Sequence, residues 1–423
     1  MTEPTTAPLP ASSPARSDGA DVVALVGGRV VPVVGEPIEG GTVLMSGGKI
    51  QAIGADVAVP DGARVVDVSG RWVLPGFVEA HGHIGIDEEA NGPMGDDVNE
   101  MTKPNTAGVR AIDGINIDDE GFRDALAGGV TSAVIKPGSG NVIGGQSVAI
   151  KTWGGRTVDE QVIAESVSVK SALGENPKRV YGGKKQLPST RLGVAFVIRE
   201  AFLKAQHYAA QRVAAEKKGE PFARDLELET LVRVLDGELA WDQHVHRHDD
   251  LATALRLADE FGYRLVVNHG TEGHKLADVL AERDVPVIFG PMLTSRTKVE
   301  LRDRAIENIV KLAAAGVRVA ITTDHPVVPI NLLVLQAALA VRDGLPRQTA
   351  LEALTINPAS FLGLDGRIGA LAPGLDADVV VWSGDPLDVP SRAEQVYIDG
   401  TLVYAWDDAA HRGRVVERSE RFA

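Results

Sequence analysis

The feature that most constrains the fold is an alternation of β-like and helix-like segments between residues 75 and 365. Helical periodicity occupies stretches such as 251–261, 275–283 and 300–315. Strands that alternate with helices form parallel sheets, and about eight of them predict a (β/α)8 barrel rather than an open sheet. The strands are expected at residues 74–83, 131–135, 147–151, 162–170, 239–246, 264–268, 285–289 and 317–322.

Both ends of the chain carry a different pattern. Residues 20–74 and 366–423 contain short β-like runs broken by glycine and proline, with turn signals such as Asp399-Gly400. Because chain termini often lie close together, we predict one small β-sandwich domain built from both ends, beside a barrel of residues 75–365. Residues 1–19 are rich in proline, serine and threonine and lack the apolar segment of a signal peptide, so we expect a disordered tail.

The composition excludes several classes of function. The chain has 423 residues and a formal net charge of −15, which argues against nucleic acid or an anionic membrane as a partner. It contains no cysteine, so any metal must be held by histidine, carboxylate or a lysine-derived oxygen. No apolar run approaches the length of a membrane span. A cytoplasmic enzyme with a small-molecule substrate is the simplest expectation.

Two long insertions interrupt the alternation. Residues 84–118 follow the first strand and are rich in Asp, Glu, Asn and Gly. Such a loop either caps a site or is a solvated excursion, and the sequence leaves both interpretations open. Residues 188–238 carry the charge spacing of exposed helices, which indicates a helical insertion at the surface, with a partner-binding helix as the weaker alternative.

Histidines gather at the expected strand ends. His81 and His83 are two residues apart at the end of the first strand, so both side chains point to one face. His269 ends the sixth strand and Asp324 ends the eighth. Chemistry in barrels of this type occurs at the carboxyl ends of strands, and imidazole is the commonest neutral metal ligand. The set as a whole therefore predicts a metal site, although each histidine alone would not.

Five short stretches together resemble the amidohydrolase superfamily of metal-dependent hydrolases, in its imidazolonepropionase-like and prolidase-like branch. They are PGFVEAHGH, HVHR, NHGTE, TTDHP and GLDADVVVWSGDPL. The resemblance covers residues 22–405. It implies a distorted (β/α)8 barrel beside a β-sandwich, and hydrolysis of an amide, a cyclic amide or a dipeptide-like C–N bond.

The resemblance also implies a set of metal ligands, residue by residue. His81 and His83 match the ligand pair of strand one, and Asp324 matches the carboxylate of strand eight. His244 matches the ligand of strand five, and His269 that of strand six. The implied cofactor is a divalent metal, in the first place zinc, with manganese or iron as alternatives and one or two ions per chain.

Two positions of this set stay open. His246 shares a face with His244 and is either the strand-five ligand or a substrate contact. In many relatives a carboxylated lysine at the end of strand four bridges two metals. Here Lys170 fits that position best, and Glu175 is the alternative bridging group or a neighbour of the site.

The implied chemistry is attack by a metal-activated hydroxide on a carbonyl or amidine carbon. Asp324 would act as general acid/base, taking the water's proton and passing it to the leaving nitrogen. Arg247 next to His246 is a candidate clamp for a substrate carboxylate. The substrate-binding candidates are His246, Arg247, Glu272, His325 and Glu175, with Arg191 and His274 as further polar residues near strand ends.

Two other functions remain alternatives. A deaminase would use the same hydroxide on a small heterocycle and would release ammonia. A non-catalytic assembly protein is the third hypothesis, because some members of the superfamily have lost their ligands. This chain keeps the ligand-type residues, which favours the enzyme. A homo-oligomer is expected only at the level of the family.

Overall fold

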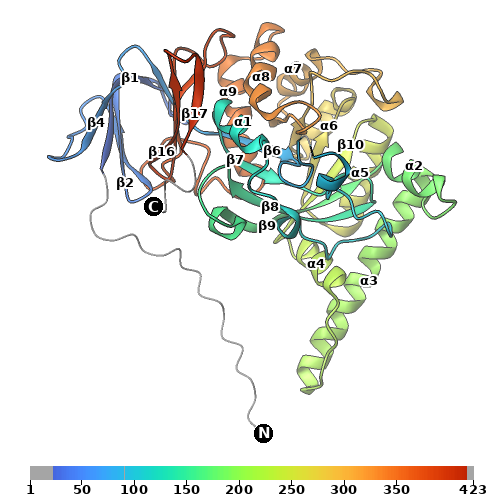
Figure 1. Ribbon diagram of the computed structural model, residues 1–423. Helices are drawn as coiled ribbons and strands as arrows, with labels where there is room; N and C mark the ends of the chain where they lie inside the picture. The colour runs from blue at the N-terminus through green and yellow to red at the C-terminus, as the bar shows by residue number, and fades with distance from the viewer. Residues whose placement is uncertain (1–21, 90, 417–423) are drawn as a thin grey trace.

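The computed structural model of the protein describes residues 22–89 and 91–416 and contains two β-sheets, one of them surrounded by helices (Figure 1). The larger body is built on an eight-stranded sheet whose strands pair in chain order. Nearly all residues of these strands are buried, as expected for strands covered on both faces. They are β6 (Phe77–Gly82), β7 (Val130–Ile135), β8 (Ile143–Lys151), β9 (Val162–Ala172), β10 (Ala240–Val245), β11 (Leu265–His269), β12 (Val287–Phe289) and β13 (Val319–Ile321).

The predicted barrel is confirmed, and its distortion lies in the third strand. β8 pairs antiparallel with both of its neighbours, with Ser132 opposite Lys151 and Ser147 opposite Ser168. The other neighbouring strands of the sheet are parallel. A parallel connection needs a crossover of a dozen or more residues, whereas segments 136–142 and 152–161 are too short for one. The chain therefore turns back on itself twice without an α-helix.

The barrel closes between its first and last strands through individual hydrogen bonds. The sheet order ends at β6 on one side and at β13 on the other. Across this gap the Thr322 Oγ1 donates to the His81 carbonyl oxygen at 2.6 Å. The His83 backbone N–H donates to the His325 carbonyl oxygen at 2.9 Å. These contacts bring the ends of β6 and β13, which carry ligand-type side chains, directly beside each other.

Helices cover the outside of the barrel, and one closes its base. Inward-facing apolar side chains from the early parts of the strands, such as Val78 and Val266, pack with Phe361 of α10 in a separate core. This plug occupies the end of the barrel away from the histidines. The helices are α1 (Gly121–Ala127), α2 (Glu175–Gly183), α3 (Arg191–Lys218), α4 (Leu226–Leu235), α5 (His248–Phe261), α6 (Ala277–Glu282), α7 (Glu307–Ala314), α8 (Leu333–Arg342), α9 (Arg347–Leu354) and α10 (Ile356–Phe361).

Short 3-10 turns occur in the connections. η1 and η2 lie in the insertion after β6, and η5 lies in the loop after β12. They are η1 (Gly92–Gly95), η2 (Ala111–Gly114), η3 (Val158–Gln161), η4 (Gly273–Leu276), η5 (Val299–Leu301) and η6 (Ile330–Leu332).

The second sheet joins the two ends of the chain, as predicted. Strands from both ends meet where β14 pairs antiparallel with β5, with Val380 opposite Leu74. The order is β17-β16-β15-β14-β5-β1-β2-β3, and β4 pairs with β1. The predicted disordered tail of residues 1–19 lies outside the described residues, and the exact domain boundaries stay a prediction. The strands are β1 (Val23–Val30), β2 (Ile38–Ser46), β3 (Lys49–Gly54), β4 (Arg64–Asp67), β5 (Trp72–Pro75), β14 (Val379–Trp382), β15 (Ala393–Ile398), β16 (Thr401–Asp407) and β17 (Arg412–Val415).

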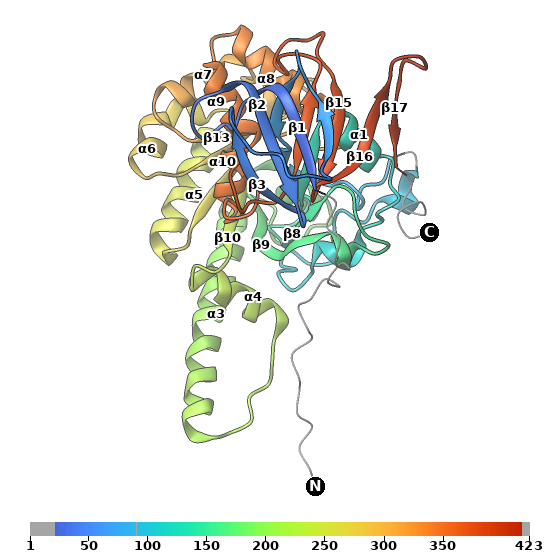
Figure 2. The same cartoon turned by 90° about the vertical axis from the view of Figure 1, so that its left-hand side faces the viewer.

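The insertion of residues 188–238 forms a helical arm. α3 begins with the Thr190 side chain accepting a hydrogen bond from the Gly193 N–H, and it ends at Gly219 in the left-handed conformation. Its first half packs against the barrel, where the ring centroids of Phe202 and Trp241 of β10 are 4.8 Å apart, while its second half projects away from the body (Figures 1 and 2). Within the described part of the chain, no helix is long and apolar enough to cross a membrane.

Candidate metal centre

The strand ends bring the predicted ligand-type side chains to one place. His81 lies on β6, His244 on β10 and His269 at the last position of β11. The imidazole rings of His269 and His81 have their centroids 5.0 Å apart, and those of His269 and His244 are 4.5 Å apart. His246 joins the same group, 4.9 Å from His269. Three histidines, from β6 and from the end of β10, thus converge around His269.

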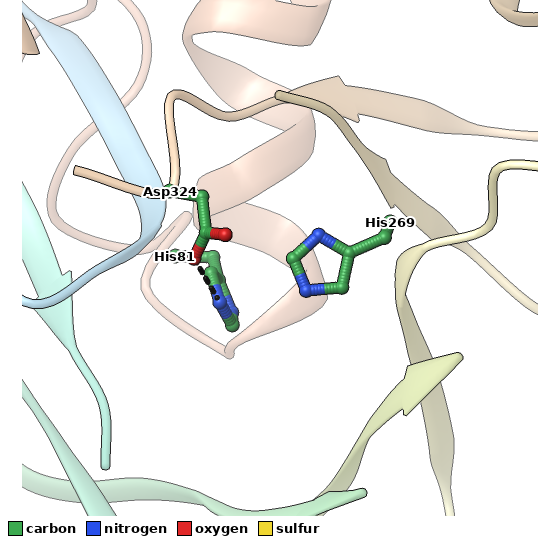
Figure 3. A group of neighbouring side chains, drawn as sticks. All are labelled: His81, His269 and Asp324. Carbon is green, nitrogen blue, oxygen red and sulfur yellow. Dashed lines mark ion pairs between the residues drawn. The ribbon is translucent and has the colours of Figure 1, made fainter. Parts of the chain in front are cut away.

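His81, His269 and Asp324 form the first compact cluster (Figure 3). One potential ligand atom from each residue lies within 4.8 Å of the other two. The Asp324 Oδ1 is 3.0 Å from the His81 Nε2 and 3.3 Å from the His83 Nε2. His269 and Asp324 have φ angles of 71° and 53°, which non-glycine residues rarely adopt and which occur preferentially at functional sites.

Hydrogen bonds to backbone carbonyls set the orientation of the imidazoles. The His83 Nδ1 donates to the Lys136 oxygen at 2.7 Å, and the His269 Nδ1 donates to the Gly290 oxygen at 2.8 Å. A neutral imidazole that donates from Nδ1 has a free lone pair on Nε2, which is the arrangement of metal-bound histidines. The Nε2 of His83 and the Oδ1 of Asp324 are then two acceptors facing each other. A cation between them would satisfy both, so these residues fit a divalent metal.

The pKa values of these side chains favour the protonation states that metal binding requires. Burial lowers the pKa of His81, His244 and His246 well below the ordinary value and lowers that of His269 to about 3. Burial opposes ionisation of Asp324, but the adjacent His81 and His83 rings outweigh it and hold its pKa well below 3.8. The centre therefore offers neutral imidazoles and a carboxylate at neutral pH, which is the donor set that Zn²⁺ prefers.

A second cluster consists of His244, His246 and Glu300, again with one potential ligand atom each within 4.8 Å. The His246 Nδ1 is 2.8 Å from the Thr271 Oγ1, which fixes the ring. Glu300 lies on η5 in the loop after β12 and is 2% exposed. Burial and the neighbouring Glu175 raise the pKa of Glu300 to about 7.

Sequence reasoning missed Glu300. The sequence placed it at the start of a predicted helix over residues 300–315, whereas α7 begins only at Glu307. The sequence around Glu300 is mostly charged, and an acidic residue at a predicted helix start is expected in any case, so the sequence offered no signal for it.

Two buried lysines lie beneath the centre in different environments. Lys170, near the end of β9, is 1% exposed, and its Nζ is 3.3 Å from the Pro137 oxygen. Burial lowers the pKa of Lys170 to about 8. Lys136, at the end of β7, is instead paired with Asp242 and lies near Asn268. Burial also lowers the pKa of Lys136, but Asp242 opposes this by favouring its charged form, and Lys170 has no such ion pair.

A cavity of about 290 Å³ opens onto the centre. His83, His244, His246 and Asp324 line it, together with Lys298 from the loop after β12. The insertion of residues 84–118 also contributes lining residues, so this part of the loop covers the site. Those residues are Asp87, Val98 and Asn99.

Most of the predicted substrate-binding residues make other contacts. The Arg247 guanidinium is paired with Asp249 at the start of α5. Glu272 is buried and pairs with His248 and Lys275, whose hydrogen bonds outweigh the effect of burial and lower its pKa to about 2. Two of the remaining candidates also lie elsewhere.

These two candidates, His325 and Glu175, occupy structural positions. The buried His325 accepts a hydrogen bond from the Ile330 N–H at 3.2 Å. Glu175 is the first residue of α2. Of the five candidates, His246 alone is among the residues lining the described cavity.

Comparison with known proteins identifies the family. The Amidohydrolase family pattern matches residues 164–404, more than half of the chain, so the protein belongs to that family. The amidohydrolase tasK of Hapsidospora irregularis is 30% identical over 388 residues, 86% of this chain but only 39% of the tasK protein. The chain thus spans well under half of that relative.

Two further relatives match over most of their length. The imidazolonepropionase of Acidiphilium cryptum (strain JF-5) is 26% identical over 380 residues, 83% of this chain and 89% of that protein. A solved amidohydrolase structure from Thermotoga maritima MSB8 has 47% identity and a TM-score of 0.88, covering 90% of this chain and 100% of the other. The protein is therefore a hydrolase of the imidazolonepropionase-like branch of the amidohydrolase superfamily, whose members generally depend on a metal.

Proposed function

We propose that the protein is a metal-dependent hydrolase acting on a C–N bond of a small molecule, namely an amide, a cyclic amide or a dipeptide-like compound. The observation that supports this most directly is the position of Asp324. Its Oδ1 lies 3.0 Å from the His81 Nε2 and 3.3 Å from the His83 Nε2, beside His269 and at the cavity wall. A carboxylate in this position could both hold a cation and exchange a proton with substrate, which supports the proposal.

The proposed ligands are four histidines and one aspartate at the strand ends, together with the buried lysine. A divalent cation bound there, in the first place zinc, would acidify a water molecule and polarise the substrate carbonyl. Lys170, as a carbamate, or Glu175 would bridge two such ions. The proposed metal ligands are His81, His83, Lys170, His244, His269 and Asp324.

The chain's own groups account for the proton transfers. Because its pKa is held well below 3.8, Asp324 is ionised at neutral pH and can accept a proton from the attacking water. The same carboxyl group then delivers that proton to the leaving nitrogen. His246 and Lys298 line the cavity and are placed to contact substrate. The 290 Å³ cavity fits a small molecule of this size class.

Metal content is the first test. The protein is purified without chelator or affinity-tag metal and analysed for elements, and then assayed on N-acyl amino acids, cyclic amides and dipeptides. Bound metal with hydrolysis that a chelator abolishes and zinc restores supports the proposal. Release of ammonia from a heterocycle instead identifies a deaminase. No bound metal after incubation with zinc or manganese overturns the proposal and leaves the assembly-protein hypothesis.

A further inference from the structure

One face of α3 exposes large apolar side chains to solvent. Leu192, Phe196 and Leu203 are 84%, 52% and 58% exposed, and Ala210 and Ala214 are exposed as well. At 3.6 residues per turn, these five positions fall within about 40° of one another around the helix axis. Single exposed apolar residues are ordinary, but a continuous stripe along a 28-residue helix marks an interaction surface.

The opposite face of α3 already has its partners within the chain. Val194, Ala201 and Tyr208 are buried in the main core, and the Tyr208 ring lies 4.9 Å from that of Phe222 on the returning segment of the arm. The apolar stripe is therefore not needed to attach α3 to the body. The second half of α3 extends away from the barrel, which leaves room beside it for another helix (Figure 2).

The spacing of the stripe is the same in both directions from Leu203. Phe196 and Ala210 lie seven residues before and after it, and Leu192 and Ala214 lie eleven residues before and after it. The large side chains thus occupy the first half and the small ones the second. When two such helices pack antiparallel about a two-fold axis at Leu203, Phe196 meets Ala210 and Leu192 meets Ala214, so each large side chain faces a small one. A parallel pair would instead set Phe196 against its own copy.

The polar residues beside the stripe are compatible with the same pairing. In an antiparallel pair, side chains on one flank of a helix lie beside those on the same flank of the other, at mirrored distances from the axis. Glu200 therefore comes beside His207 of the second copy, and Arg199 comes beside Gln206. No like charges face each other in these pairs, and the two helix dipoles run in opposite directions, so the flanks are electrostatically complementary.

We propose that α3 is a dimerisation helix, which pairs antiparallel with α3 of a second copy of this chain about a two-fold axis at Leu203. The partner is a second copy because the symmetric spacing makes the stripe complementary to itself. The contact extends along residues 192–214, roughly 33 Å at 1.5 Å per residue. None of the proposed metal ligands takes part, so the pairing is independent of the proposed hydrolysis.

Sedimentation equilibrium of the full-length protein tests the dimer, for which we expect twice the 44.7 kDa mass of one chain. Ala210→Phe should weaken dimerisation by about 10- to 100-fold, because its ring collides with Phe196 of the second copy, although the change makes the surface more apolar. The exchange of the two residues, Phe196→Ala with Ala210→Phe, should restore the dimer because a large side chain again faces a small one. Val389→Phe, at a position outside the arm that is 72% exposed, is the matched control and should dimerise normally.

Crosslinking provides a second test, which is specific because the chain contains no cysteine of its own. Leu203→Cys places a thiol at the two-fold axis and should give a disulfide-linked dimer on mild oxidation. Leu192→Cys should stay uncrosslinked, because its two copies lie roughly 33 Å apart in the antiparallel pair.

Three results would overturn the proposal. A single-chain mass at every concentration would mean that α3 does not pair with a second copy. A dimer that Ala210→Phe leaves equally stable would be formed through another surface. Crosslinking of Leu192→Cys would indicate parallel helices.

Discussion

Glu79 and Thr323 are joined by two hydrogen bonds across the gap between β6 and β13. The Glu79 Oε2 accepts from the Thr323 backbone N–H at 2.9 Å and from its Oγ1 at 2.6 Å. The Oε1 accepts from the His81 backbone N–H at 3.1 Å. Glu79 thus contacts the backbone next to Asp324 and the backbone of His81, two of the three residues whose side chains form the first cluster. The barrel closure and the ligand geometry depend on the same carboxylate.

Glu79→Gln should therefore weaken both stability and metal binding. Both oxygens of Glu79 accept hydrogen bonds, so a glutamine amide must turn its NH2 toward a donor on one side. We expect the free energy of unfolding to fall by about 1–3 kcal/mol, the cost of one unsatisfied buried group. Urea unfolding and metal content measure the two effects. Glu238→Gln at the surface is the control, and an equal effect of both variants would contradict the interpretation.

Asp324→Asn should remove most of the catalytic activity while the protein stays folded. An amide can neither accept the water's proton nor deliver it to the leaving nitrogen. We expect kcat/KM to fall by about 10²- to 10⁴-fold on whichever substrate the unchanged protein hydrolyses, the range for loss of a general acid/base. Asp343→Asn, which changes a surface partner of Arg342, should leave kcat/KM unaltered. Activity of Asp324→Asn within tenfold of the unchanged protein would rule out this role for Asp324.

Lys170 should become carboxylated in a pH-dependent way. Carbamate formation requires the neutral amine, and burial lowers the pKa of Lys170 to about 8. The neutral fraction, and hence the carbamate, should rise as the pH increases through 8. With bicarbonate enriched in carbon-13, an NMR signal of a carbamate is expected in the unchanged protein and should be absent in Lys170→Met. A signal that persists in Lys170→Met would assign the carbamate to another amine.

The sequence predicted the parts of this site that follow from regular secondary structure. His81, His83, His244 and His269 could be placed because alternation located the strands, and strand ends meet on one rim. The reversed direction of β8 could not be predicted from periodicity, since a strand has the same period of two in either direction. Glu300 was missed because it lies in an irregular loop, whose path depends on tertiary contacts such as that with Gly174.

Arg247 illustrates a different limit of sequence reasoning. Its position next to His246 suggested a clamp for a substrate carboxylate, but the structure pairs it with Asp249. Adjacent residues at a strand end point in different directions, so His246 faces the cavity while Arg247 begins the turn into α5. The guanidinium of Arg247 then pairs with Asp249, the acidic residue nearest to it in the sequence.

The two bodies of the protein are connected by a buried ionic network around Lys151 of β8. The Lys151 Nζ is 2.9 Å from the Asp376 Oδ2 and 2.6 Å from the Asp378 Oδ2, just before β14 of the other sheet. Burial alone would lower the pKa of Lys151, but Asp378, Asp399 and Asp376 outweigh it and raise the pKa above 10.5. Because the pKa of Lys151 is raised in the folded protein, its ion pairs contribute fully to the free energy of unfolding below the ordinary lysine pKa. That contribution is lost as the pH rises through the pKa of Lys151 in the folded protein.

Lys151→Met should consequently destabilise the protein by about 3–5 kcal/mol near neutral pH, because it leaves the buried Asp378 carboxylate without its cationic partner, whereas Asp376 keeps Lys49 and Arg367. The exposed Lys204→Met, which removes a helix ion pair with Glu200, should change the free energy of unfolding by less than about 0.5 kcal/mol. Urea unfolding at pH 7 and pH 5 measures both variants. Lowering the pH protonates the unpaired Asp378 carboxylate, so the deficit of Lys151→Met relative to the unchanged protein should shrink at pH 5. A deficit that stays constant over this range would mean that lost packing of the lysine side chain, rather than unpaired charge, causes the destabilisation.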